Sequence, residues 1–474
     1  MLTLVELKAC LGGVYSGSKI VQFLDIFTSF FESTITTTTR SLSRYSDMSL
    51  RTWFRFLAGS FNWIEIRVRI FSHFCSGGDP LNSSRVYILV ADETVEGKVG
   101  ACSHGISKFY SGTAGRAIKG VCFFGMSLVD TVSGTSFFLG IQQVVYSDAD
   151  KIRIAESKAK KAEKIRKKNT GTILAKGRKK GTKNKEVVEN LTASYRVFKS
   201  LFNMVTNSLT AICPQINVSY LVLDCAYGTL DYQVIAKAKN IPIISKLKSI
   251  TALYLPWIDD ADQPKLKGRP RIYGQKLNMN SLPNQYLQQT EIDEEHRTET
   301  YQLKAYAKNT FGSKLLNLVI ARRTVQRRTR ISDGKVATNI WMSTDVNLDY
   351  QTLLDYYSLR FQTVRRAIEF EFRDAKQYFG LSDFKNYKKE NLTNFVNLSF
   401  TICLVSKIQL AHYRKKLNAP NLSIIDLKLI YKARFTAKKI RAAFRLKLVR
   451  KNPNTIFNEQ FCEQFIPQDL INAA

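Results

Sequence analysis

The chain has 474 residues, 45% of them hydrophobic, which is enough for two or three packed domains and excludes a largely disordered protein. Its 71 Lys and Arg against 39 Asp and Glu give a formal net charge of +32. So basic a protein is expected to meet a polyanion, and nucleic acid is the common one. An anionic membrane surface is the competing partner, but no apolar run approaches the ~20 residues that span a bilayer.

The N-terminal sequence lacks the basic start and long apolar stretch of a signal peptide, which predicts a cytosolic protein. The eight cysteines form no C-x-x-C pair and the four histidines are scattered. Reduced thiols are therefore expected, and a structural zinc site is not.

Residues 1–80 carry aromatic and apolar residues at helical spacing, which predicts a helical N-terminal region. From Val86 the pattern changes. Three strands are expected over Val86–Ala91, Ile118–Asp130 and Thr135–Tyr146, with a turn at Val132-Ser133-Gly134 between the last two.

Residues 151–190 interrupt this pattern with 15 Lys and Arg against 4 Asp and Glu. A solvated, charged helix and loop is the ordinary explanation of such a run. On a chain already so basic, we favour a contact with the DNA backbone that includes Lys179 and Lys180.

The rest of the chain continues with alternating elements. The expected ranges are a helix over about 187–210, a strand over Val218–Asp224, a helix over Tyr232–Lys239, a strand over Ile241–Lys248, a mainly β insertion over 250–342, a long helix from Tyr350 and a basic helical tail to about 451.

Carboxylates follow both buried strands. The apolar run Val86–Ala91 stops at Asp92, and a second apolar strand ends in Asp224. A buried acid is costly unless it is paired, hydrogen-bonded or bound to a metal, and a lone aspartate here is more often a turn cap. Glu369 lies on a helix that can pack against both strands. Three carboxylates suit two magnesium ions and in-line displacement at phosphorus, so together they favour phosphodiester chemistry.

The sequence also resembles a family. The stretches that carry the resemblance are ADETVEGKVGACSHGISKFY, LDCAYG followed by ISKLKSITALYLP, KGRPRIYG, WMSTDVNL, YYSLRFQ and IEFEFRDAKQYFGL. In this order they are similar to the motifs of bacterial insertion-sequence DDE transposases with a Tyr-Arg-Glu-Lys signature, over roughly residues 86–400. The resemblance implies an α/β fold: a ribonuclease H-like catalytic domain, with a mixed sheet flanked by helices and a mainly β insertion. It also implies cut-and-paste movement of a DNA element by 3′-hydroxyl attack, with a hairpin at the transposon end.

The resemblance sets the expected organisation and partners. The domains are a helical DNA-binding region (1–80), the first part of the catalytic core (81–249), a β-rich insertion (250–342), the last part of the core (343–400) and a basic helical C-terminal region (401–474). The implied cofactor is two Mg²⁺ ions, with Mn²⁺ as a substitute. The implied partners are double-stranded DNA, as terminal inverted repeats and target, and a second copy in a synaptic homodimer, at the bacterial nucleoid and away from membranes.

The resemblance also assigns the site. Asp92, Asp224 and Glu369 match the catalytic, metal-binding triad. Lys376 matches the signature lysine, and because seven residues make about two helical turns it shares a face with Glu369 and is expected to hold a phosphate. Arg373 is expected to support the acid face or a phosphate. The neighbouring acids Glu93, Glu371 and Asp374 are interpreted as surface or supporting acids.

Further DNA contacts are expected in the insertion. Arg269 and Arg271 lie in the stretch GRPR, where a DNA contact is favoured over an independent AT-hook. Trp341 matches a tryptophan that stacks on a flipped base, although a tryptophan taken alone is more often a core residue. Tyr227 is equally well explained by packing and by contact.

One departure concerns the signature itself. Tyr357-x2-Arg360 is followed by eight residues before Glu369, where the family has three. In a continuous helix Arg360 then faces away from the site, whereas Arg365, four residues before Glu369, lies on the correct face. Either the insert Thr363–Ala367 loops out, or Arg365 replaces Arg360, or this copy is impaired. Deletion of the insert is expected to raise hairpin formation and excision.

Alternative functions remain open at this point. A non-catalytic DNA-binding protein explains the charge but not the three acids. A ribonuclease H-like nuclease explains the acids but not the insertion or the basic flanks. A catalytically impaired transposase copy that acts only as a DNA-binding protein explains every feature.

Overall fold

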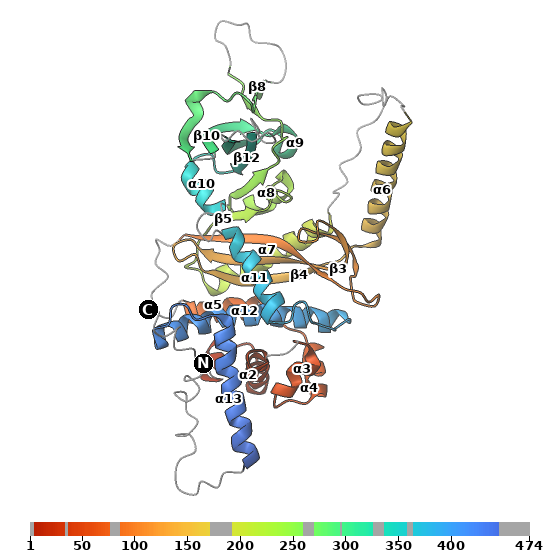
Figure 1. Ribbon diagram of the computed structural model, residues 1–474, viewed down its shortest axis with the longest axis vertical. Coiled ribbons are helices and arrows are strands. Elements are labelled where there is room, and N and C mark those ends of the chain that lie inside the picture. Colours follow the sequence, from red (N-terminus) through yellow and green to blue (C-terminus); the bar gives the residue numbers. More distant parts are fainter. Residues whose placement is uncertain are drawn as a thin grey trace.

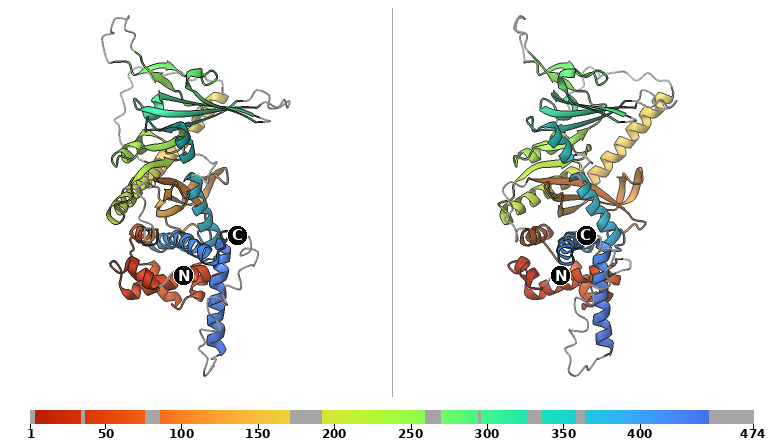
Figure 2. Two further views of the ribbon diagram at one scale, coloured as in Figure 1. Left: turned by 90° about the vertical axis from the view of Figure 1, so that its left-hand side faces the viewer. Right: turned by 60° about the vertical axis from the view of Figure 1, so that its left-hand side comes forward.

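The computed structural model describes residues 4–33, 37–75, 86–170, 192–258, 270–293, 296–325, 336–357 and 364–444. Figure 1 shows three parts stacked along the longest axis: helices near the N-terminus, a central sheet, and the strands of the insertion. Two further views show the same order of layers (Figure 2).

The N-terminal part is helical, as expected. Its helices are α1 (Leu4–Leu11), α2 (Gly17–Glu32), α3 (Thr39–Leu42), α4 (Leu50–Leu57) and α5 (Trp63–Cys75). Aromatic side chains join them, since the ring of Phe23 packs edge-on against those of Phe56 and Trp63. The indole N–H of Trp63 donates to Asn394 Oδ1 at 2.7 Å, which ties this part to helix α12 (Lys389–Leu417).

The central sheet contains the three expected strands before residue 150 and an additional short one. The strands are β1 (Tyr87–Gly97), β2 (Ser107–Ser111), β3 (Arg116–Asp130), β4 (Ser136–Val144), β5 (Val218–Leu223) and β6 (Ile243–Leu247). Their order is β4-β3-β1-β5-β6, and β2 pairs with the first residues of β3. β1, β3 and β4 pair antiparallel, whereas β1, β5 and β6 pair parallel. Three antiparallel strands continued by two parallel ones are the ribonuclease H-like arrangement, so the expected α/β fold is confirmed.

The insertion extends this sheet. Its strands are β7 (Tyr254–Pro256), β8 (Tyr273–Lys276), β9 (Leu287–Ile292), β10 (His296–Tyr306), β11 (Leu315–Val325) and β12 (Val336–Ser343), with a short helix α9 (Lys308–Phe311). β12 pairs antiparallel with β6. The core and insertion strands therefore form one 12-stranded sheet.

Helices cover both faces of the sheet. The covering helices are α7 (Ala193–Ile212), α8 (Leu230–Lys237), α10 (Tyr350–Tyr357), α11 (Val364–Tyr378) and α12, whereas α13 (Ile424–Phe444) packs on α2 and α12, and α6 (Asp148–Asn169) stands apart. Because strand residues alternate between faces, Val90, Val222 and Ile244 pack into a core with α10, α11 and α12. Their neighbours Leu89 and Leu221 pack on the other face, with α7 and α8. We call the face of Val90 and Val222 the acid face.

The helices after residue 350 differ in part from those predicted from the sequence. The long helix expected from Tyr350 is described as two helices, α10 and α11, and residues 358–363 lie outside the description. α12 crosses residue 400, the expected boundary of the core. α12 is also the one described helix long and apolar enough to cross a membrane, but 78% of its apolar window is buried within the protein.

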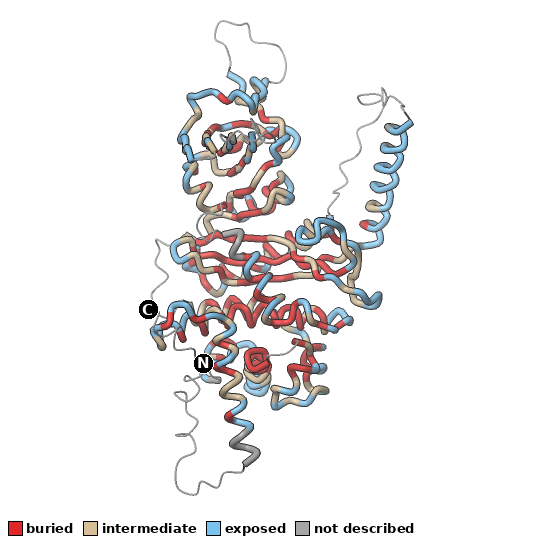
Figure 3. The backbone as a smooth tube through the Cα atoms, in the orientation of Figure 1, coloured by how far each residue is buried: buried red, intermediate tan, exposed pale blue. Residues whose placement is uncertain are grey.

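α6 differs from the other long helices. Figures 1 and 3 show it projecting from the sheet with an exposed surface along its length. Its base is fixed where the buried Asp150 pairs with Arg153 at 2.7 Å and with Arg196 of α7. The first part of the basic run is therefore a solvated helix, and residues 171–191, with Lys179 and Lys180, lie outside the described residues.

Candidate active site

Asp92 and Asp224 lie side by side on neighbouring strands. The parallel pairing of β1 with β5 ends at Ala91 and Leu223, so the two aspartates are the next residue on each strand. Paired strands are about 4.8 Å apart. The sequence predicted that the strand ends at Asp92. β1 instead continues to Gly97 with β3 as its partner, so Asp92 is inside the strand. The two acids therefore lie just past the end of the β1–β5 pairing.

Both aspartates are oriented in the same way. They follow Val90 and Val222 by two residues and therefore project from the acid face. The backbone N–H of Glu93 donates to Asp92 Oδ1 at 2.8 Å, and the N–H of Cys225 donates to Asp224 Oδ1 at 2.5 Å. In each case the amide of the following residue fixes the carboxylate, so the two groups are held in place before any ligand arrives.

A tight turn follows Asp224. The carbonyl oxygen of Asp224 accepts the N–H groups of Tyr227 at 2.9 Å and Gly228 at 3.0 Å, and the hydroxyl of Ser245 at 3.1 Å. A Cβ atom at Gly228 would lie 2.3 Å from Ser245 Oγ. Only glycine therefore lets the chain leave β5 so close to β6.

Glu369 and Glu371 on α11 have opposite environments. Two residues turn a helix by about 200°, so the two side chains face different ways. Glu369 is exposed. Glu371 is 1% exposed and accepts hydrogen bonds from Ser136 Oγ at 2.9 Å and from Ser127 Oγ. Lys407 of α12 pairs with it at 2.5 Å. Glu371, expected as a surface or supporting acid, is a buried anchor that joins α11 to β3, β4 and α12.

α11 lies close against the sheet beside Asp92. The cross-strand partner of Asp92 is Gly125 on β3. A Cβ atom at Gly125 would lie 2.8 Å from the ring of Phe372, so the missing side chain makes room for this ring. One turn further, Lys376 Nζ lies 2.7 Å from Glu96 Oε1 and donates to the carbonyl of Val95 at 3.2 Å.

These contacts give the direction of α11 relative to β1. Phe372 lies at the level of Asp92 and Lys376 lies at the level of Glu96, so the helix and the strand run the same way. Glu369 is within one turn of Phe372 and is therefore near the level of Asp92. Within the described ranges, no three His, Cys, Asp or Glu side chains are close enough to hold a metal ion. The structure thus brings Asp92 and Asp224 together and places Glu369 on an exposed helix face beside them.

Two residues continue the row of aspartates across the sheet. Val222 pairs with Ile244, so Asp224 is level with Lys246 on β6, and Lys246 pairs with Trp341 on β12. All lie on the acid face, and Lys246 Nζ is 5.1 Å from the centroid of the Trp341 ring. Lys246 was not singled out from the sequence, although its position two residues after an apolar strand residue, level with Asp224, is a signal that could have found it.

Trp341 is partly buried, and its stacking role stays a prediction. Its ring is partly buried against the acid-face core, as in a packing role. Its indole nitrogen is buried and has no hydrogen-bond partner among the residues that the structure describes. The ring therefore lies at the edge of the core, next to a lysine and two strands from Asp224.

The remaining predicted residues lie elsewhere. Tyr357 is buried at the end of α10, and Arg373 pairs with Asp374 at 3.0 Å and lies over the ring of Phe370. Arg271 lies over the ring of Trp257 in the insertion, 4.9 Å from its centroid. Arg269, Arg360 and Thr363 lie outside the described residues, and the side chains of residues 364–367, which include Arg365, are not described.

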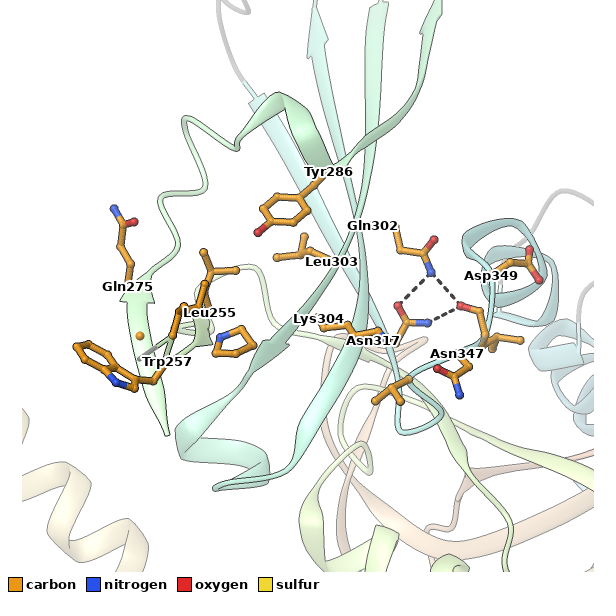
Figure 4. Close-up of a pocket in the computed structure, with 15 residues that line it drawn as sticks. Leu255, Trp257, Gln275, Tyr286, Gln302, Leu303, Lys304, Asn317, Asn347 and Asp349 are labelled. Atoms are coloured by element: carbon orange, nitrogen blue, oxygen red, sulfur yellow. Dashed lines mark hydrogen bonds between the residues drawn. The ribbon is translucent and has the colours of Figure 1, made fainter. Parts of the chain in front are cut away.

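Trp257 borders a cavity of about 970 Å³ in the insertion (Figure 4). At its far side the amides of Gln302 and Asn317 donate to the carbonyl of Leu348, at 2.9 and 2.5 Å. These bonds attach the chain that leads into α10 to the insertion. Neither aspartate lines this cavity, so it is separate from the candidate active site.

Glu93 lies on the opposite face of the sheet. It follows Asp92 and points toward α7 and α8, where one of its carboxylate oxygens is buried without a hydrogen-bond partner among the described residues. Burial, followed by the nearby Glu93, raises the pKa of both Cys122 and Tyr227. Glu93 thus lies behind the strand that carries Asp92, and Tyr227 has a packing environment, in ring contact with Phe124.

The comparison with known families decides the class of the protein. The family described as DDE superfamily endonuclease matches residues 51–310 of the 474. The chain belongs to this family. The matched range contains Asp92 and Asp224, the two acids that lie on neighbouring strands. It ends before Glu369.

No curated protein matches this DDE superfamily chain. Among solved structures it is similar to the piggyBac transposase in a synaptic complex with hairpin DNA, at a TM-score of 0.37 and 10% identity, over 94% of this chain and 77% of that one. This is a weak structural similarity.

Proposed function

We propose that the protein is a DNA transposase that moves an insertion sequence by cut-and-paste, through phosphodiester hydrolysis and strand transfer at terminal inverted repeats. The observation that carries the proposal is the placement of Asp92 and Asp224 next to each other on the acid face, in a chain of the DDE superfamily endonuclease family. Two fixed carboxylates at this point suit phosphodiester chemistry better than a binding role, because DNA repels unpaired acids.

The donor set fits a hard divalent cation. Aspartate oxygens held by backbone amides are ligands of the kind that Mg²⁺ prefers, and Mn²⁺ accepts the same donors. Asp92 and Asp224 would hold the metal ions together, with Glu369 as the third ligand. When bound, two such ions activate a water or a 3′-hydroxyl and stabilise the leaving oxygen.

Basic side chains around the acids would hold the DNA. Lys246 is level with Asp224, and Lys376 lies one helical turn beyond the level of Asp92, so the two ammonium groups would bind phosphates on either side of the scissile bond. Trp341, adjacent to Lys246, would stack on an unpaired base. The exposed basic helix α6 would add backbone contacts, and a second copy would complete the synaptic complex with target DNA at the nucleoid.

The test is cleavage of a labelled terminal repeat with Mg²⁺ and with a chelator. Asp92→Asn and Asp224→Asn should each abolish cleavage and leave DNA binding nearly intact, because binding depends on phosphate contacts. Asp148→Asn is the matched control, since Asp148 is exposed on α6 and pairs only locally with Lys151. Either active-site variant cutting faster than about a hundredth of the wild-type rate would count against the assignment, because metal ligands contribute several kcal/mol.

A catalytically impaired copy that acts only as a DNA-binding protein is the second candidate. One observation favours it: the exposed Glu369 does not form a metal-binding group with the two aspartates within the described residues. If the wild type binds terminal repeats but does not cut them with Mg²⁺ or Mn²⁺, this candidate replaces the first. Deleting Thr363–Ala367, which restores the spacing of the signature, should then raise cleavage.

A further inference from the structure

A groove of about 720 Å³ separates the N-terminal helices from the chain that follows α11. Four segments line it: the start of α3, the side of α4, the loop before α12 and the first turn of α12. The lining residues are Thr38, Thr39, Arg40, Phe54, Ala58, Lys385, Asn386, Tyr387, Lys388 and Asn391. In Figure 1, α3 and α4 lie on the side of α12 that faces away from the sheet.

The groove is positively charged. Arg40, Lys385 and Lys388 line it, and no lining residue is an aspartate or a glutamate. None of the three cations has an ion-pair partner within the described parts of the chain. Three uncompensated charges around one groove favour an anionic ligand with spaced charges.

Two aromatic rings give the groove an apolar wall. Phe54 is 44% exposed and Tyr387 is 55% exposed, although most aromatic residues of this N-terminal part are buried. Threonine and asparagine residues also line the groove. A ligand with alternating phosphates and sugar rings matches this combination, whereas a small anion would not use the rings.

The groove is held in shape without a ligand. Thr39 Oγ1 donates to Asn386 Oδ1 at 3.2 Å, and Asn386 Nδ2 donates to the carbonyl of Asn391 at 3.2 Å. On the other side, the N–H of His104 donates to the carbonyl of Tyr387 at 2.9 Å. The wall that carries Lys385 and Lys388 is therefore attached both to the N-terminal helices and to the sheet.

The groove also lies along the direction of β1. Ser382 Oγ donates to Glu96 Oε2 at 3.1 Å, and Lys98 Nζ donates to the carbonyl of Phe384 at 3.0 Å. β1 thus leads from Asp92 past the Lys376–Glu96 pair to the loop that forms the groove, over about 20 Å at 3.3 Å per residue.

We propose that this groove binds the backbone of duplex DNA on the flank of the cleavage point, with Arg40, Lys385 and Lys388 on successive phosphates and Tyr387 and Phe54 against the sugars. This proposal rests on the proposed function, because it takes DNA as the substrate. In this proposal the N-terminal helices and the core bind the DNA together, because each part supplies some of the residues that line the groove.

The test measures DNA binding and not cleavage. Affinity for a random-sequence duplex is measured against salt concentration, with chelator present, for the wild type and the triple variant Arg40→Gln/Lys385→Gln/Lys388→Gln. Each phosphate contact adds about 0.9 to the slope of log K against log salt, so the triple variant should lose about 2 to 3 units of slope. The control is Lys199→Gln/Lys237→Gln/Lys239→Gln, which removes three exposed charges from α7, α8 and the turn after it on the opposite face and should keep the slope.

The aromatic wall has its own pair of variants. Tyr387→Ala should weaken binding a few-fold at constant slope, and Tyr387→Phe should not, because it keeps the ring; the backbone bond to His104 remains in both variants. Thermal unfolding of all variants should match the wild type, since the changed side chains lie on the surface.

Three outcomes would overturn the groove proposal. The first is an unchanged slope in the triple variant, and the second is an equal loss in the control, which would show a general charge effect. The third is competition by polyglutamate as effective as that of DNA, which would make the groove a docking site for an acidic protein segment. If the wild type cuts DNA and the triple variant binds DNA normally, the groove proposal is wrong but the proposed function stands. If the wild type binds no DNA, both the groove proposal and the proposed function are wrong.

Discussion

Phe372 of α11 packs against Gly125 of β3, and Gly125 is the residue directly across from Asp92. The contact sets how closely the helix that carries Glu369 approaches the strand that carries Asp92. Glu371, the residue before Phe372 on α11, is fixed by Ser127, Ser136 and Lys407. Two contacts therefore hold α11 at this distance from the sheet. The geometry of the third acid therefore depends on a residue without a side chain.

Replacing Gly125 with alanine should displace α11. The added Cβ would meet the Phe372 ring at 2.8 Å, closer than real contacts allow. Overpacking of this kind costs about 1–3 kcal/mol of stability, and cleavage should fall more than stability because Glu369 moves with the helix. Gly112→Ala is the control, since its Cβ would meet nothing within 4 Å. Adding Phe372→Leu to Gly125→Ala should recover part of the activity, and no recovery would contradict this explanation.

The two glutamates of α11 should respond in opposite ways. Glu369→Gln should abolish cleavage with an unchanged unfolding midpoint, because the side chain is exposed. Glu371→Gln should lower the stability by about 3–5 kcal/mol, because it leaves the Lys407 ammonium without its buried partner. Denaturant unfolding and cleavage assays on both variants check this. Loss of cleavage by Glu371→Gln at full stability would make Glu371 the third acid instead.

Lys376 should be essential for cleavage beyond its ion pair with Glu96. Glu96 is 7% exposed, so Lys376→Met alone leaves a buried charge and should destabilise the protein. The double variant Lys376→Met/Glu96→Gln removes both charges and should recover stability. If Lys376 holds a substrate phosphate, the double variant still cuts at least about a hundredfold more slowly than the wild type, in line with a lost contact to a charged group. Recovery of both properties would reduce Lys376 to a structural role.

The pH dependence of stability should contain a contribution from Glu32, at the end of α2. Burial raises the pKa of Glu32 to about 8, against the opposing effect of Lys438. Between the ordinary value of 4.5 and about 8, the unfolded chain has lost this proton and the folded chain retains it. Stability from this group is therefore highest below pH 4.5, falls as the pH rises to about 8 and is constant above it, by an amount on the order of a few kcal/mol.

The variant Glu32→Gln isolates this contribution. It keeps the shape of the side chain and carries no charge, so its stability should change less than that of the wild type between pH 5 and pH 8. Denaturant unfolding at both values checks the difference. A wild type and variant with parallel pH profiles would show that the Glu32 carboxyl titrates normally in the folded protein.

The sequence alone was sufficient for features that depend on neighbours along the chain. Continuous apolar runs in β1, β3 and β5 predicted strands, helical spacing predicted the N-terminal helices, and the family resemblance of the motifs predicted the ribonuclease H-like sheet. These patterns are local, because side-chain direction repeats every 2 residues in a strand and every 3.6 in a helix. The apolar runs themselves end at Asp92 and Asp224, which is how the sequence pointed to these two acids.

Tertiary structure decided everything that depends on register and on packing between distant segments. Asp92 and Asp224 are adjacent because Ala91 pairs with Leu223, and Lys246 and Trp341 join them because β12 pairs with β6 in a particular register. Of two glutamates separated by one residue, only packing against Ser127, Ser136 and Lys407 made Glu371 the buried one. A one-residue change of register would send each strand side chain to the other face, so no local pattern can fix which side chains meet.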